Sequence, residues 1–117
     1  MKFTTRLQIP GLNKRERWHW AQQRREVRDW EIRARVLPPL TTKRRRHVTI
    51  TSYRRQRFHD EANLVGGCKG LIDGLVRAGL LVDDSTTWAT FTYRQELASA
   101  SPLGRGMPCT VIEIEDA

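Results

Sequence analysis

Alternation of apolar and polar positions predicts a β-strand at each of two places in the first half of the chain. Within residues 2–9, KFTTRLQI, one face of a strand would carry Phe3, Thr5, Leu7 and Ile9. Pro10 and Gly11 end this strand. Residues 44–58 carry β-branched and aromatic side chains between two basic blocks, which predicts a second strand with Val48 and Ile50 inward.

The last third of the chain predicts two further strands separated by a loop. Residues 86–97, TTWATFTYRQEL, and residues 109–115, CTVIEIE, have the composition and alternation of strands, and we expect Val111 in the core. Between them, residues 98–108 are small and are interrupted by proline and glycine, which is typical of a long, mobile connection.

Two segments have helical spacing instead. From about residue 17 to residue 37, apolar positions recur at three, four or seven residues: Trp20, Val27, Trp30, Ala34 and Leu37. Pro38 and Pro39 stop this helix. Its outer face is a row of arginines: Arg24, Arg25, Arg28, Arg33 and Arg35.

The second predicted helix begins near Ala62 or Asn63 and runs to Ala78, with Gly79 as its stop. One broad apolar face consists of Leu64, Cys68, Leu71, Ile72, Leu75 and Val76. Along its edge, at spacings of four, stand Lys69, Asp73 and Arg77. Three glycines fall on the side away from the apolar face: Gly67, Gly70 and Gly74. They indicate either a close approach of another backbone, from a second subunit or a DNA strand, or an irregular start of the helix.

The element order is therefore strand, helix, strand, helix, strand, strand. With 117 residues the chain is long enough for one domain, residues 1–117. We expect an α+β two-layer sandwich, in which two helices cover one face of a small mixed four-stranded sheet.

Charge is distributed unevenly along this pattern. Residues 14–57 hold 15 of the 21 lysines and arginines and only four acids, so this part carries +11 and the remainder −3 of the net +8. A basic half joined to an acidic cluster suggests a polyanionic partner, although solvated arginine faces would give the same composition.

We find no apolar run of the ~20 residues that a membrane span needs and no secretory signal, which predicts a cytoplasmic protein without membrane contact. The two cysteines, Cys68 and Cys109, lack metal-ligand spacing and are expected to be buried.

The acidic residues form two pairs that could share a metal ion. Asp60 and Glu61 follow the second strand, and Asp83 and Asp84 follow the second helix. If the pairs converge, their repulsion favours a divalent cation such as Mg²⁺, or Mn²⁺, which can activate water at a phosphodiester.

The lysine of this segment, Lys69, would then serve the phosphate, with Asp73 orienting it. Alternatively, the carboxylates are helix caps and turn residues, and Lys69 with Asp73 is an ordinary surface pair.

The segment HDEANLVGGCKGLIDGLVRAGLLVDDS, residues 59–85, resembles the core signature of the RusA family of Holliday junction resolvases, and IPGLNKRERWHW, residues 9–20, is similar to the family's first strand and loop. The resemblance implies a homodimeric, Mg²⁺-dependent endonuclease of bacterial or prophage origin that makes paired nicks in four-way DNA junctions. It assigns Asp60 as the first acidic metal ligand, Lys69 as the catalytic lysine and Asp84 as the closing aspartate, with Asp83 beside it and Asp73 as the helix acid.

Two departures from the family pattern bear on activity. Ala62 stands where the family commonly has a second aspartate, and the spacer between Asn63 and Lys69 is longer than in the best-known member. Glu61 is the nearest substitute ligand, so the expected metal ligands are Asp60, Glu61 and Asp84. The alternatives are a branched-DNA-binding protein that has lost catalysis and an RNA-binding or purely structural basic module.

A DNA enzyme needs a phosphate-binding surface, and the basic blocks of the first half supply one. The residues expected to contact DNA are Lys14, Arg15, Arg17, Arg44, Arg45, Arg46, Arg54, Arg55 and Arg57.

Overall fold

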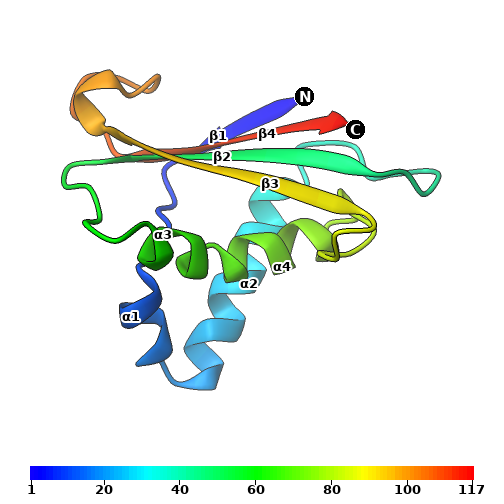
Figure 1. The fold of residues 1–117 in the computed structure, drawn as a ribbon, viewed down its shortest axis with the longest axis horizontal. Coiled ribbons are helices and arrows are strands. Elements are labelled where there is room, and N and C mark those ends of the chain that lie inside the picture. Colours follow the sequence, from blue (N-terminus) through cyan, green and yellow to red (C-terminus); the bar gives the residue numbers. More distant parts are fainter.

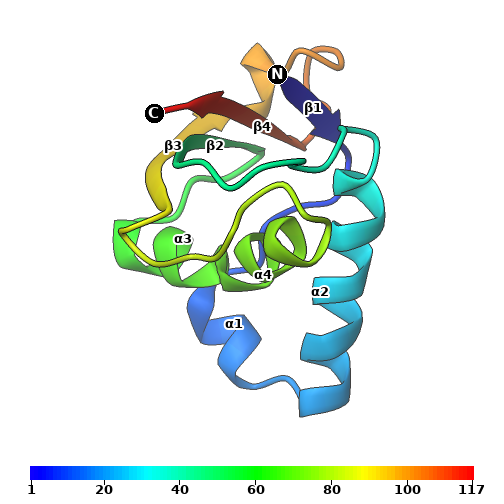
Figure 2. The ribbon, with the colours of Figure 1, turned by 90° about the vertical axis from the view of Figure 1, so that its right-hand side faces the viewer.

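The computed structural model describes residues 1–117, which form a sheet and a layer of helices beneath it (Figure 1). The strands are β1 (Lys2–Thr5), β2 (Arg46–Arg54), β3 (Ala89–Leu97) and β4 (Cys109–Asp116). The helices are α1 (Leu12–Glu16), α2 (Trp20–Ala34), α3 (Glu61–Gly67) and α4 (Lys69–Arg77), and a short 3₁₀ turn, η1 (Ala98–Ala100), follows β3. The α-helices all lie on one face of the sheet (Figure 2). None of them is both long and apolar enough to span a membrane.

The sheet has the strand order β1-β4-β2-β3. β4 pairs antiparallel with both β1 and β2, while β3 pairs parallel with β2, from Arg46 opposite Ala89 to Arg54 opposite Leu97. The α3–α4 segment is the crossover that joins the two parallel strands. β3 is an edge strand, because β2 is its only neighbour.

The predicted fold class, an α+β fold with a mixed four-stranded sheet, is confirmed. The prediction of two helices is incomplete, since α1 lies in a segment expected to be a loop. The second expected helix is divided into α3 and α4 at Cys68. The Cys68 N–H donates to the carbonyl of Val65, three residues earlier, as in a 3₁₀-helix. The two preceding residues, Gly66 and Gly67, are weak helix formers.

The first strand is shorter than predicted. β1 ends at Thr5, whose hydroxyl accepts hydrogen bonds from the Leu7 N–H at 3.2 Å and from Arg33 Nε at 3.1 Å. The chain then leaves the sheet, but Ile9 is still buried in the core.

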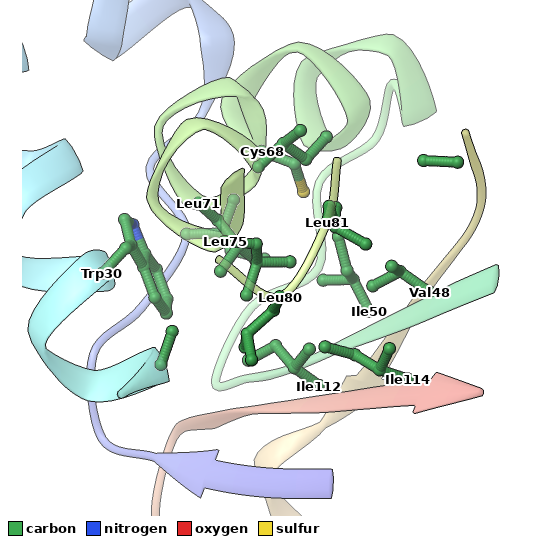
Figure 3. Close-up of a cluster of buried hydrophobic side chains, with 14 of the residues drawn as sticks. Trp30, Val48, Ile50, Cys68, Leu71, Leu75, Leu80, Leu81, Ile112 and Ile114 are labelled. Carbon is green, nitrogen blue, oxygen red and sulfur yellow. The ribbon is translucent and has the colours of Figure 1, made fainter. Parts of the chain in front are cut away.

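The core lies between the sheet and the helices α2 and α4 (Figure 3). Val48 and Ile50 of β2 are buried in it, as predicted. The last strand lies where it was predicted, and Val111 is buried, as expected. Ile112 and Ile114 belong to the main core cluster, whereas Val111, which pairs with Thr51, points to the opposite face of the sheet. Since neighbouring strand residues point to opposite faces, the sequence CTVIEIE fits either register until the partner strand fixes it.

The glycines of the crossover helices face other segments of the same chain. An added Cβ would lie 1.9 Å from the Pro10 carbonyl oxygen at Gly67, 2.1 Å from Glu26 Oε1 at Gly70, and 2.7 Å from Trp30 Cβ at Gly74. The expectation that a second subunit or a DNA strand approaches these glycines is therefore wrong. They let α3 and α4 pack closely on the segment before α1 and on α2.

We expect Gly67→Ala to lower the free energy of unfolding by about 1–3 kcal/mol or more, because the added methyl would overlap a backbone carbonyl that cannot move away alone. Gly66→Ala is the matched control in the same helix. Its methyl would meet only the flexible end of the Leu12 side chain, and alanine gains roughly 0.5–1 kcal/mol of helix propensity. Urea denaturation of both variants tests this, and equal losses would contradict the assignment.

A buried ion pair ties α1 to α2. Arg15 Nε lies 2.7 Å from Glu26 Oε1, and the two side chains are only 10% and 7% exposed. The Arg15 carbonyl also accepts a hydrogen bond from Gln23 Nε2 at 2.9 Å, whereas Glu26 Oε2 has no hydrogen-bond partner. A buried charge is tolerated only when it is paired, so this contact fixes how α1 sits on α2.

Candidate active site

Asp60 lies just past the end of β2 and begins α3. Its Oδ1 accepts a hydrogen bond from the Ala62 N–H at 2.9 Å, so Asp60 is the N-cap of the helix. Glu61 is the first residue of α3, and both side chains are exposed. The second carboxylate oxygen of Asp60 accepts no hydrogen bond within the chain and is open to a ligand.

Asp83 and Asp84 lie in the turn between α4 and β3. Asp83 Oδ1 accepts a hydrogen bond from the Ser85 N–H at 2.7 Å, which is the expected turn geometry for an aspartate. Hydrogen bonding from the Ser85 side chain and backbone, with a smaller contribution from Lys43, holds the pKa of Asp83 below its ordinary value. Asp83 is therefore ionised at neutral pH, and Asp84 beside it is exposed.

The structure does not bring the two acidic pairs together within one subunit. Asp60 and Glu61 follow the end of β2, whereas Asp83 and Asp84 precede the start of β3, and these two strands run parallel in register over nine residues. At ~3.3 Å per residue, the two ends are about 26 Å apart. The expected convergence is wrong because a crossover between parallel strands returns the chain to the opposite end of the sheet. No three His, Cys, Asp or Glu side chains of one subunit are close enough to hold a metal ion.

Lys69 stands between the two acidic pairs, at the first position of α4. Its Nζ lies 3.7 Å from Asp73 Oδ2, and the two side chains are 64% and 36% exposed. The predicted Lys69–Asp73 pair therefore forms, with the i,i+4 geometry of a surface pair. Both side chains face solvent, so the ammonium can reach a bound phosphate.

Six of the nine basic residues expected to contact DNA are exposed: Lys14, Arg17, Arg44, Arg45, Arg55 and Arg57. Arg44 also pairs with Asp116 at 3.0 Å, and hydrogen bonding from Arg44 is the main reason that the pKa of Asp116 lies below its ordinary value.

The other three arginines make contacts that serve the fold, and their contact with DNA stays a prediction. Arg15 is buried against Glu26. Arg46 Nη1 donates to the Leu80 carbonyl at 3.0 Å, and its Nε lies 3.3 Å from Asp116. Arg54 Nη1 donates to the Ile9 carbonyl at 2.7 Å, and its guanidinium lies 3.9 Å from the Phe58 ring centroid. In β2, positions 46 and 54 share the inward face with Val48 and Ile50, which buries Arg46, while Arg54 at the end of the strand stays half-buried and lines an open concavity.

Two open concavities surround the Asp60 end of the sheet. One, of about 520 Å³, is lined by Gln8, Arg54, Arg55 and Arg57, among others. The second, of about 350 Å³, contains His59 and Glu61 together with Arg57 and Arg94. The structure thus places exposed guanidinium groups beside the acidic pair, and it adds Arg94 and Gln8, which come from other segments and had no local sequence signal.

The cysteines play no part in this chemistry. Burial is the main cause that raises the pKa of Cys68 to about 12, with Glu26 adding to the effect. Cys68 therefore stays a thiol at neutral pH and cannot act as a nucleophile or a metal ligand. Cys109 is also buried, so the prediction of two buried cysteines is confirmed.

No protein-family model matches this chain, and no curated protein is significantly similar to it.

Proposed function

We propose that the chain is a RusA-like endonuclease, dependent on Mg²⁺ or Mn²⁺, that hydrolyses phosphodiester bonds in four-way DNA junctions. One observation carries the proposal: exposed carboxylates stand beside exposed basic side chains at both ends of the β2–β3 pair. Arg57 and Arg94 share a concavity with Glu61, and the charge of Lys43 contributes to lowering the pKa of Asp83. Arginine and lysine bind phosphates, and carboxylates bind the hard divalent cations that activate water, so each end holds part of what phosphodiester hydrolysis needs.

A homodimer is the simplest way to unite the two parts. β3 is nine residues long and has one free edge, to which a second copy can add its own β3. Antiparallel pairing about a two-fold axis at Tyr93 would put the start of one β3 beside the end of the other. In this register Arg94 faces Thr92 and Glu96 faces Thr90, so no like charges oppose each other.

This pairing would change the distance between the acidic pairs. Since β2 ends level with β3, Asp60 and Glu61 of the partner would lie at the same end of the joined sheet as Asp83 and Asp84. The strand ends that these pairs adjoin would be offset by two strand spacings, about 10 Å, whereas within one subunit they are about 26 Å apart. The dimer would thus contain two equivalent composite sites, as paired nicking of a symmetric junction requires.

The carboxylates of one subunit do not fit a single Mg²⁺, but a composite site supplies oxygen ligands of the kind that this ion takes: Asp60 and Glu61 from one copy and the partner's Asp83 and Asp84. A bound Mg²⁺ would activate water and stabilise negative charge on the scissile phosphate. Lys69 would offer its ammonium to the phosphate, while Asp73 limits the directions in which the lysine points.

Cleavage of a labelled four-way junction, beside a linear duplex of the same sequence, tests the proposal. With Mg²⁺ or Mn²⁺ we expect nicks in the junction only, and none in EDTA or with Asp84→Asn. The variant should keep or gain junction affinity, because a negative charge near the phosphate is removed. If the wild type cleaves the junction with neither metal, the proposal that the protein is a nuclease is overturned.

A second function is favoured by one residue, Ala62. It occupies the first turn of α3 with an exposed methyl group, where the family pattern has a metal-binding carboxylate. Tight junction binding without cleavage in either metal would identify a branched-DNA-binding protein that has lost catalysis.

A further inference from the structure

The outer face of α2 carries a second basic surface, away from both acidic pairs. It is an open concavity of about 850 Å³ with five arginines and a single carboxylate, Glu31, in its wall. The arginines are Arg24, Arg25 and Arg28 from α2, Arg35 directly after its last residue, and Arg77 from the end of α4. We refer to this concavity as the α2 groove.

Most of the charge in the α2 groove is not neutralised within the chain. Glu31 pairs with Arg35 across one turn of the helix. The other four arginines form no ion pair with any carboxylate of the chain. Such a concentration of free guanidinium groups in one concavity attracts phosphates strongly.

A tryptophan lies at one end of this groove. Trp20 is 62% exposed, although the apolar spacing of the sequence predicted it on the buried face of the helix. That prediction is wrong because α4 crosses α2 further along, where Gly70 meets Glu26 and Gly74 meets Trp30, so nothing covers the first turn. The start of α2 lies far from the sheet (Figure 2).

The neighbours of the Trp20 ring leave it accessible. The Arg24 guanidinium lies 5.4 Å from the ring centroid, and the His19 ring lies 5.2 Å away at a tilt. Ile32, in the same groove, is 54% exposed. An aromatic ring among unpaired arginines is the combination that binds unpaired nucleotides, whose bases stack on the ring while their phosphates contact the cations.

We propose that the α2 groove binds single-stranded DNA, with phosphates on Arg24, Arg25, Arg28 and Arg77 and one base stacked on Trp20. A duplex would match the charge but hides its base faces in its own stack, so the exposed indole favours an unpaired strand. A second concavity, of about 420 Å³, shares Arg24 and Arg77 with the groove and includes Asp73. A strand in the groove would therefore continue toward the Lys69–Asp73 pair. If the proposed function holds, this would be an unpaired strand of the opened junction.

Fluorescence anisotropy of a labelled oligothymidylate, against a duplex of equal length, tests the groove. We expect Trp20→Ala to weaken single-strand binding roughly tenfold or more, in line with the usual contribution of one stacked base, and to leave duplex binding nearly unchanged. Arg28→Glu should weaken single-strand binding and reduce its salt dependence, with a slope smaller by about 0.7 for each lost phosphate contact. The matched control is Arg6→Glu, which makes the same charge change at an exposed site outside the groove.

Two outcomes would overturn the groove as a DNA site: oligonucleotide affinity that Trp20→Ala leaves intact, or equal losses from Arg28→Glu and Arg6→Glu. Trp20 and Arg28 are exposed, so thermal unfolding should match the wild type and exclude misfolding as the cause. Binding to phosphatidylserine vesicles that requires Trp20, with oligonucleotide binding that does not, would assign the surface to membranes and also overturn the proposal. The groove and the nuclease are tested independently, since Asp84→Asn should abolish cleavage without changing oligothymidylate binding.

Discussion

Mixing Asp60→Asn subunits with Asp84→Asn subunits should restore DNA nicking that neither variant shows alone. The two residues lie at opposite ends of the parallel β2–β3 pair, so in the proposed homodimer each site takes one of them from each copy. A mixed dimer then contains one site with both lesions and one site with none. Random assortment makes about half of the dimers mixed, which restores about a quarter of the wild-type sites.

The restored activity should have a distinct product pattern, because a mixed dimer has a single intact site. Gel analysis should show single nicks in the junction in place of paired ones. Asp60→Asn mixed with Glu61→Gln is the control, since these two lesions lie at the same end of the sheet and damage both sites of a mixed dimer. A site built within one subunit predicts no recovery in either mixture, and that result would refute the composite site while leaving wild-type cleavage in place.

Glu26→Ala should destabilise the protein by roughly 3–5 kcal/mol, because it leaves the Arg15 guanidinium buried without a counter-charge. This is a large part of the 5–15 kcal/mol that an ordinary domain has in total. The loss should appear as an earlier urea transition with a similar slope, and α1 should become the segment most accessible to proteases.

The same helix offers a matched control, Glu31→Ala. Glu31 also pairs with an arginine, Arg35, but that side chain is 64% exposed, and such a pair contributes only about 0.3–0.5 kcal/mol. Replacing both members of the buried pair, as Arg15→Met with Glu26→Leu, should recover much of the stability, since no uncompensated charge remains. Similar losses for Glu26→Ala and Glu31→Ala would show that burial of the Arg15–Glu26 pair has no special role.

Much of the fold could be predicted because local patterns determine it. The β-branched alternation of 46–54 and the apolar spacing of 69–77 each have one periodicity, so strand and helix were placed nearly where the structure has them. The assignment of Ile112 and Ile114 to the main core cluster, and the short helix α1, were missed where a pattern was ambiguous or absent. In both cases the deciding contacts come from distant segments, β2 for the register and Glu26 for α1.

The candidate site was less predictable than the fold. The sequence shows which residues can bind a metal or a phosphate, but their exposure depends on which face of an element they occupy. Arg46 resembles Arg45 in the sequence, yet strand alternation buries Arg46 and leaves Arg45 exposed. Trp20 is the opposite case: its spacing predicted burial, but no other helix covers it and its side chain is exposed.

The sequence by itself determined the α+β class, the four strands and two main helical segments, and the strongly basic first half, because composition and periodicity are properties of neighbouring residues. It also nominated Asp60, Lys69, Asp73, Asp83 and Asp84 as candidate site residues. Only the tertiary structure decided that Asp60 and Asp84 stand at opposite ends of the sheet, since the parallel direction of β3 relative to β2 is fixed by packing across the whole domain. The same packing placed Gly67, Gly70 and Gly74 against other segments of the same chain and left the α2 groove open.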